Sequence, residues 1–129
     1  MYLGLTKAKV IVENPETHAS REVELIVDTG SVLTWISRKV LEELGVKPRR
    51  VRQFKAIDGR AITREVGVTT IRYEGYEGDV EVIFAEEGDA QVLGVTALET
   101  LGLEVDQVTG KLKYVGHLAL YNDRWHLFN

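Results

Sequence analysis

The nine residues Val23–Ser31 read VELIVDTGS, and the interpretation of the whole chain starts from them. Four of the first five are apolar, which is typical of a buried β-strand. An ionisable residue, Asp28, follows that strand directly, and three small residues, Thr29, Gly30 and Ser31, come next. Such an aspartate can bond the backbone amides of an ordinary turn, or it can be held at the strand end for chemistry.

The composition indicates one domain rich in β-structure. The chain has 129 residues, of which 44% are hydrophobic and only 8% aromatic. This length is most simply a single domain, residues 1–129. Because Val, Ile and Leu carry most of the apolar mass, a sheet is favoured over a helical bundle.

Charge and cysteine content exclude several classes of partner and site. The net charge of −4 does not favour nucleic acid as a general partner. The chain has no cysteine, which excludes disulfides and thiolate metal sites and fits the expected cytoplasmic location. No apolar run is long enough for a signal peptide or a membrane span. His18, His117 and His126 match no zinc spacing, so we expect neither a metal nor a cofactor.

The first half of the chain predicts a hairpin and a helix. Residues 7–12 and 21–27 read as two strands that turn at Asn14 and Pro15. A helix is expected over about 37–44, with Ser37 as its N-cap and Gly45 as a left-handed stop.

The middle of the chain predicts a projecting hairpin. Asp58-Gly59 is a strong signal for a two-residue turn, which would pair Ile57 with Arg60 and Ala56 with Ala61. Neither face of this hairpin is cleanly apolar, so we expect an arm that covers something intermittently. The basic segment 47–55 beside it is interpreted as the solvated face of a strand.

The second half predicts further strands and a second helix. Strands are expected over 67–73 and 79–85, then a short one over 90–93 that Gly94 interrupts. Thr96 and Glu99 form a capping-box pattern for a helix of about two turns that Gly102 ends. A last hairpin joins 103–106 to 111–115. The sequences LEELGV (41–46) and LETLGL (98–103) echo each other, and two related halves and coincidence both remain open.

Three of these features together resemble the retropepsin-like aspartic proteases, the single-lobe relatives of pepsin and of retroviral proteases. They are the Asp28-Thr29-Gly30-Ser31 signature, the Asp58-Gly59 hairpin, and the step Val92-Leu93-Gly94 before a short helix. The resemblance covers residues 5 to 115 approximately. It implies a mostly-β, closed-barrel lobe with a flap hairpin and one or two short helices.

The resemblance also implies roles for these residues. Asp28 would be catalytic, Thr29 would bond its symmetry mate, Gly30 would admit the substrate backbone, and Ser31 would orient the Asp28 carboxylate. The flap would span about 52–65, with Ile57, Asp58, Gly59 and Arg60 at its tip. Val92, Leu93 and Gly94 would form the glycine loop of the second half-lobe.

The chain contains a single Asp-Thr-Gly, so a pair of aspartates needs a second chain. Gly94 stands where a second aspartate would be, and Asp106 lies in a later turn, the wrong place for a catalytic loop. A twofold homodimer would bring two Asp28 residues face to face. The expected function is therefore a homodimeric aspartic endopeptidase that cleaves peptides or proteins with water activated between the two Asp28 carboxylates.

Other interpretations remain open. The same fold can serve as a non-catalytic peptide-binding or assembly module, or as a latent enzyme that needs a partner or trimming. Ile36, Ile57 and Ile62 are either apolar subsites or core residues, and Trp35 is expected in the core. The ion pair that retroviral enzymes form after their glycines is absent, because Val32 and Leu33 follow Ser31 while Val95 and Thr96 follow Gly94.

The C-terminal extension, about 116–129, is too apolar for a free tail. It can cover the protein's own core or form the dimer seam. Its apolar residues are Leu118, Leu120, Trp125, Leu127 and Phe128.

Overall fold

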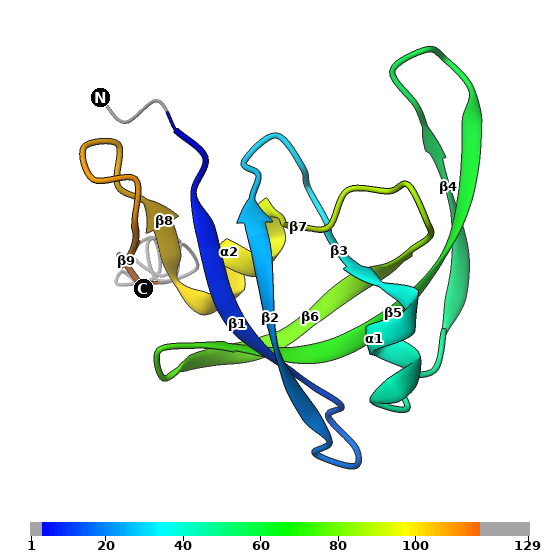
Figure 1. The fold of residues 1–129 in the computed structure, drawn as a ribbon, viewed down its shortest axis with the longest axis horizontal. Helices are drawn as coiled ribbons and strands as arrows, with labels where there is room; N and C mark the ends of the chain where they lie inside the picture. The colour runs from blue at the N-terminus through cyan, green and yellow to red at the C-terminus, as the bar shows by residue number, and fades with distance from the viewer. Residues whose placement is uncertain (1–3, 117–129) are drawn as a thin grey trace, which may run out of the picture.

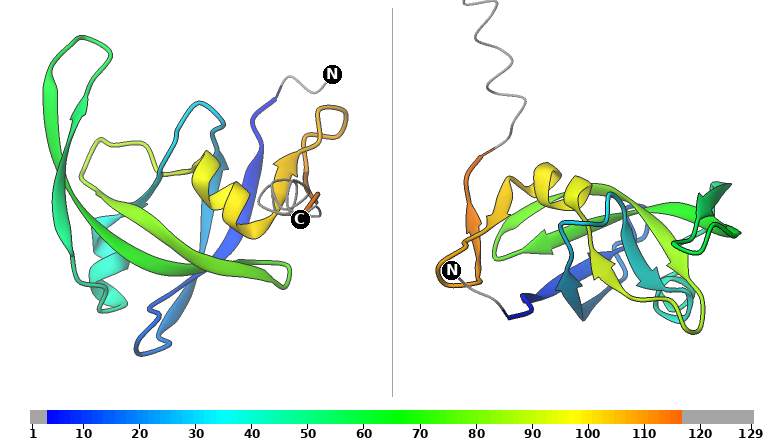
Figure 2. Two further views of the ribbon diagram at one scale, coloured as in Figure 1. Left: turned by 180° about the vertical axis from the view of Figure 1, so that it is seen from behind. Right: turned by 90° about the horizontal axis from the view of Figure 1, so that it is seen from above.

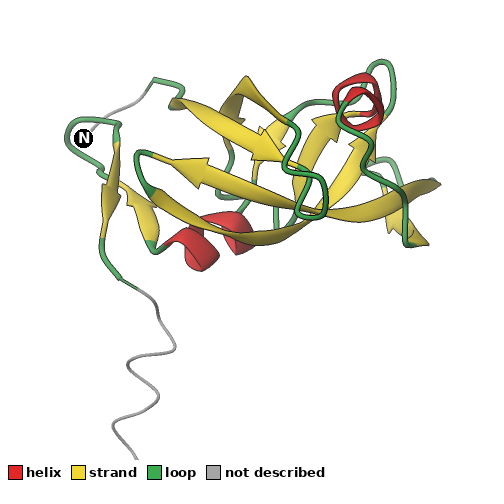
Figure 3. Cartoon of the chain, turned by 90° about the horizontal axis from the view of Figure 1, so that it is seen from below, coloured by secondary structure: helices red, strands yellow, loops and turns green. Residues whose placement is uncertain are grey.

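A computed structural model describes residues 4–116 and shows a ring of β-strands with two short helices (Figures 1 and 3). The main sheet has the order β1-β2-β7-β3-β6-β5-β4, and β1 also pairs with β5, which closes the ring. The mostly-β closed barrel predicted from the sequence is confirmed. Its elements are β1 (Lys7–Glu13), β2 (Ser20–Val27), β3 (Thr34–Ser37), α1 (Arg38–Glu43), β4 (Arg50–Lys55), β5 (Ala61–Tyr73), β6 (Tyr76–Ala85), β7 (Val92–Leu93), α2 (Val95–Leu101), β8 (Leu103–Val105) and β9 (Leu112–Tyr114).

The predicted first hairpin is present as β1 and β2, with Val10 opposite Val23. Alternate residues of β1 are buried, as expected for a strand with one face on the core. Asn14 fixes the turn through its side chain. Its Oδ1 accepts from the backbone amide of Glu16 at 2.9 Å, and its Nδ2 donates to the backbone oxygen of Leu44 at 2.9 Å.

The core fills the ring and consists almost entirely of aliphatic side chains. β1 closes the ring by pairing Ile11–Glu13 with Thr70–Arg72 of β5. The largest fully buried side chains come from β2, β3, β5, β6, β7 and both helices, so elements far apart in the sequence share one core. They are Phe84, Leu25, Ile36, Leu41, Ile71, Ile83, Leu93 and Leu101.

The region around α1 agrees with the sequence except for one strand. The Ser37 hydroxyl accepts from the amide of Lys39, and Gly45 has a φ of +75°, so both predicted helix ends are confirmed. The unpredicted strand β3 precedes the helix, parallel to β6 and antiparallel to β7. Ile36 lies in β3 with 0% of its surface exposed, so it is a core residue and not a substrate subsite.

The flap hairpin is formed by β4 and β5 and extends away from the ring (Figure 2). Its predicted register is wrong by one residue. Lys55 pairs with Ala61, and the amide of Ala56 donates to the oxygen of Arg60, so Ala56 faces Arg60 instead of Ala61. The turn thus contains three residues, 57–59, and ends at Gly59 with a φ of +89°. A three-residue loop that ends in a left-handed glycine is a common hairpin geometry, and Asp58-Gly59 fits it as well as the two-residue turn.

The second helix begins one residue before the predicted capping box. Gly94 is the N-cap of α2, so Thr96 lies inside the first turn and its hydroxyl donates to the backbone oxygen of Val32 at 2.9 Å. The capping-box prediction is therefore wrong. The predicted helix end at Gly102 is confirmed by its φ of +76°.

The remaining predictions concern the chain ends and the surface. β8 and β9 form the expected last hairpin. The apolar residues of the C-terminal extension lie outside the described residues. Arg50 and Arg52 both ion-pair with Glu81, which agrees with a solvated strand face in the basic segment. Among residues 4–116, no helix is long and apolar enough to span a membrane.

Two isoleucines test the core assignment. Ile36→Ala should lower the free energy of unfolding by about 2–5 kcal/mol, because it leaves a cavity in the ring. Ile57→Ala, at a fully exposed position, should change it by less than about 0.5 kcal/mol. Urea denaturation followed by circular dichroism measures both, and equal effects would contradict the placement of Ile36.

Candidate functional site

The Asp28 loop is held by backbone hydrogen bonds to two other parts of the chain. The amide of Val27 donates to the oxygen of Thr6 at 2.8 Å, and the amide of Asp28 donates to the oxygen of Leu93 at 3.0 Å. Within the loop, the amide of Gly30 donates to Oδ1 of Asp28 at 2.9 Å. These bonds fix both the backbone and the carboxylate of Asp28, which remains exposed.

The predicted glycine loop of the second half-lobe packs directly against the Asp28 loop. Val92 and Leu93 pair in parallel with Ile26 and Val27. Beyond them, a Cβ at Gly94 would stand 2.3 Å from the backbone oxygen of Leu33. No other residue type fits at such a distance, so glycine at this position allows the two loops to meet.

Further hydrogen bonds tie the two loops together. The buried hydroxyl of Thr34 accepts from the amide of Gly94 at 3.0 Å. The amides of Val95 and Thr96 donate to the backbone oxygens of Ser31 and Val32 at 2.8 and 3.0 Å. The first turn of α2 is thereby anchored to the loop that carries Asp28. Thr34 was not singled out from the sequence, where nothing distinguishes it from other strand threonines.

Ser31 supports the loop in a different way from the one expected. Its hydroxyl donates to the backbone oxygen of Leu33 at 2.7 Å. A hydroxyl has one proton, and an ionised carboxylate only accepts, so Ser31 does not bond the Asp28 carboxylate in this structure.

Thr29 is exposed and borders two cavities on the side of the loop away from the flap. The larger, of about 300 Å³, lies between α2 and β8, and the smaller, of about 160 Å³, lies beside Leu5. Two exposed aliphatic side chains line these cavities, Val115 in the larger one and Leu5 in the smaller one.

A cleft separates the Asp28 loop from the flap hairpin. A cavity of about 570 Å³ lies between residues 30–33 and the side chains of Phe54 and Ile62. A second cavity, of about 220 Å³, is lined by Asp28, Asp89 and Val92, among others. The two cavities share Ser31 and Trp35 in their linings and lie next to an exposed carboxylate, and concave sites of this kind are where ligands bind.

Trp35 and the flap residues contribute to this cleft to different degrees. Trp35 lines both cavities and contacts Phe54 with ring centroids 5.5 Å apart, so it is a cleft residue as well as part of a small apolar cluster. At the flap tip, hydrogen bonds from the backbone and then the side chain of Arg60 lower the pKa of Asp58. Ile57 points into solvent at that tip, and Ile62 lines the cleft.

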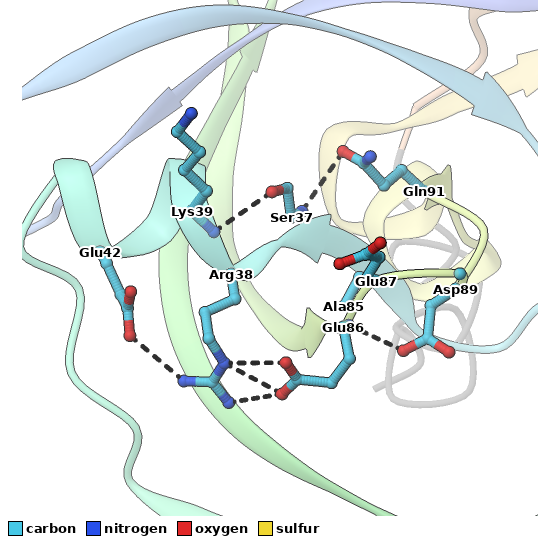
Figure 4. Close-up of a pocket in the computed structure, with 10 residues that line it drawn as sticks. Ser37, Arg38, Lys39, Glu42, Ala85, Glu86, Glu87, Asp89 and Gln91 are labelled. Atoms are coloured by element: carbon cyan, nitrogen blue, oxygen red, sulfur yellow. Dashed lines mark hydrogen bonds and ion pairs between the residues drawn. The ribbon is translucent and has the colours of Figure 1, made fainter.

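Sequence reasoning missed an ion-pair cluster on the loop between β6 and β7. Arg38 donates to both oxygens of Glu86 at 2.7–3.1 Å, to Glu42 at 3.4 Å and to Glu65 at 2.6 Å (Figure 4 shows the first two). These hydrogen bonds lower the pKa of Glu86. The only signal in the sequence is the acidic turn EEGD at 86–89, which does not reveal its partners.

Among known proteins, a protein family and a solved structure are similar to this chain. A family model described as aspartyl protease matches residues 15–105. The solution structure of the simian foamy virus (mac) protease matches with a TM-score of 0.49 and 19% sequence identity, over 72% of this chain and 91% of that chain. No curated protein sequence matches the chain. Within residues 4–116, no three His, Cys, Asp or Glu residues are grouped so that they could hold a metal ion.

Two fully buried threonines test the contact between the loops. Thr34→Val removes the acceptor of the Gly94 amide and should lower the free energy of unfolding by about 1–3 kcal/mol, because a buried donor loses its partner. Thr69 is also 0% exposed, and among the described residues its hydroxyl has no hydrogen-bond partner. Thr69→Val is the matched control and should be neutral or stabilising. Equal losses in urea denaturation would contradict the role of Thr34.

Proposed function

This chain belongs to the aspartyl protease family, and we propose that it is an endopeptidase whose active unit is a homodimer with one Asp28 from each chain. The observation that carries the proposal is the exposed Asp28 carboxylate, fixed by the Gly30 amide at the edge of a cleft. An ionisable group held in place at a cleft and left open to solvent is suited to catalysis.

Within residues 4–116, a single chain supplies one available carboxylate at this place. Gly94, the counterpart of the aspartate loop, has no room for a side chain. Asp89 lines the same cavity as Asp28, but Arg64 donates to both of its oxygens at 2.7 and 2.9 Å. Asp106 is used in its own turn, where it accepts from the amides of Val108 and Thr109. With the described acids beside this cavity accounted for, a second chain is the source proposed for the partner of Asp28.

The surface around Thr29 supports self-association. Its exposed aliphatic side chains lie next to the catalytic loop, and a twofold axis through that loop would bury them against their own copies. In this arrangement Thr29 would face its symmetry mate, as predicted from the sequence. The described part of the chain also ends in this region, since Val115 and Gly116 line the larger cavity beside Thr29.

The chemistry then follows the general logic of paired carboxylates. Two such groups about 3 Å apart do not both ionise, so the pair holds one proton between them. The ionised member removes a proton from a water molecule, which attacks the peptide carbonyl, and the protonated member donates to the carbonyl oxygen. Closure of the flap hairpin would exclude bulk water and add backbone hydrogen bonds to the extended substrate.

One test of the proposed function concerns the catalytic carboxylate. Asp28→Asn should lower kcat/KM at least about 100-fold for any peptide that the wild type cleaves, because an amide cannot act as the base. The wild-type kcat/KM should follow a bell-shaped curve with pH, since the dyad works only with one proton. Cleavage that survives in the variant would end the assignment. Peptide binding without turnover at any pH would instead support a binding module, and turnover only after removal of the tail would indicate a latent enzyme.

Another test of the proposed function concerns the sharing of the site between two chains. When wild-type chains are mixed with an equal amount of Asp28→Asn chains and allowed to exchange, activity per wild-type chain should fall to about half, because mixed dimers carry one carboxylate. Thr69→Val chains are the control and should not reduce it. An activity unaffected by Asp28→Asn chains, with exchange verified by mass spectrometry, would contradict the shared site.

A further inference from the structure

We propose that the ion pair between Arg64 and Asp89 positions one wall of the substrate cavity beside Asp28 and neutralises the charge of that wall. The proposal rests on the proposed protease function and identifies a positioning residue, Arg64, on the flap strand. It concerns the loop 86–91 between β6 and β7, which is called the wall loop below.

Asp89 organises the wall loop from within. Its amide donates to the backbone oxygen of Glu86 at 3.0 Å, and its Oδ2 accepts from the amide of Glu86 at 2.8 Å. These two bonds close a tight turn, which passes through Gly88 with a φ of +92°. The carboxylate of Asp89 is therefore held in place even without Arg64.

Arg64 connects this turn to the flap hairpin. Its Nε donates to Oδ2 of Asp89 at 2.7 Å and one terminal nitrogen donates to Oδ1 at 2.9 Å, a bidentate pair. Both side chains are mostly buried, at 18% and 17% exposure. The hydrogen bonds from Arg64 lower the pKa of Asp89, so the carboxylate remains charged. The geometry makes this a well-directed contact between the flap strand and the wall loop.

A second connection runs in parallel with the first. Glu65, the next residue of β5, accepts from Arg38, which also holds Glu86 at the start of the wall loop. Arg38 packs over the ring of Phe84, 5.0 Å from its centroid. Two consecutive flap residues are thus tied to the wall loop, so a shift of the flap strand is transmitted to the cavity wall.

The wall loop contacts the space in which a substrate would lie next to the catalytic group. Asp89 and Ala90 line the cavity of about 220 Å³ together with Asp28 and Trp35. Asp89 also lines the larger pocket, of about 530 Å³, that is drawn in Figure 4. It therefore lies between that pocket and the cavity beside Asp28. While Arg64 is present, the charge of Asp89 is balanced and the wall offers no net charge to a substrate side chain.

The pair therefore has two separable effects. Loss of Arg64 would loosen the wall loop relative to the flap, which weakens substrate binding. It would also leave an unbalanced carboxylate, still held by the Glu86 amide, on the wall of the cavity. A lysine side chain next to the scissile bond should then bind better than an uncharged one of similar length.

The kinetic experiment compares two peptides that differ only in Lys or Met beside the scissile bond. Arg64→Met should raise the ratio of their kcat/KM values about tenfold in favour of Lys, and the effect should appear mainly in KM. The double variant Arg64→Met with Asp89→Asn should remove this preference, and Arg64→Lys should retain a ratio near that of the wild type. An unchanged ratio in Arg64→Met would overturn the charge-neutralising role.

The matched control is Arg72, on the same strand. It pairs with Glu13 at 3.1 Å, at 33% and 15% exposure, and neither residue lines the cavity beside Asp28. Arg72→Met removes a comparable ion pair and should leave the peptide ratio and KM unchanged. If Arg72→Met reproduced the effects of Arg64→Met, they would reflect general destabilisation and the proposal would fail.

Hydrogen exchange provides a readout that does not need activity. The amides of the wall loop should exchange about tenfold faster in Arg64→Met and in Arg64→Lys than in the wild type. In Arg72→Met their exchange rates should equal those of the wild type. If the wild type cleaved no peptide, the protease function would fail while this measurement still tested the positioning role. Unchanged exchange of residues 86–91 in a folded Arg64→Met protein would overturn that role.

Discussion

The fold depends on the close approach of two loops at Gly94. The parallel pairing of β2 with β7 brings the loop after each strand to the same place, where a side chain would collide with the backbone of Leu33. Because the two loops approach so closely, the amides of Val95 and Thr96 bond the backbone of the Asp28 loop, and the amide of Gly94 bonds the Thr34 hydroxyl at the start of β3. The Asp28 loop therefore lies on a rigid base, and a rigid base is what keeps a catalytic group within reach of its target.

Under the proposed function, the same constraint explains why one chain would carry only half of a site. Position 94 has no room for a side chain and so cannot carry an aspartate, and residues 92–94 contribute support in place of chemistry. Asp89, which lines the same cavity as Asp28, is committed to Arg64. Under the proposed function, one contact between two chains has two effects. It buries the exposed aliphatic surface beside Thr29, and it supplies a partner for Asp28.

Structural features that neighbouring residues determine could be predicted from the sequence. Features that depend on contacts between distant parts of the chain could not. Gly45 and Gly102 end their helices because each needs a left-handed backbone, and the alternation in β1 marks its buried face. β3 was missed because it is short and its partners lie about 50 residues away. The flap register was wrong by one residue because Asp58-Gly59 suits two turn lengths. The partners of Arg64 and Arg38 were missed because charge pairing between distant loops leaves no periodicity in the sequence.

The ion pairs of the wall loop bear on how the site would persist in acid. A dyad that needs one proton favours conditions that also protonate ordinary surface carboxylates. Hydrogen bonds from Arg38 and Arg64 hold the pKa values of Glu86 and Asp89 below their usual range. Stability from groups with lowered pKa values is present above the unfolded value and is lost only as the pH falls through the folded one. The carboxylates of the wall loop thus remain charged and paired at a pH at which ordinary carboxylates become neutral. The ion pairs therefore allow the cleft to keep its shape at a lower pH.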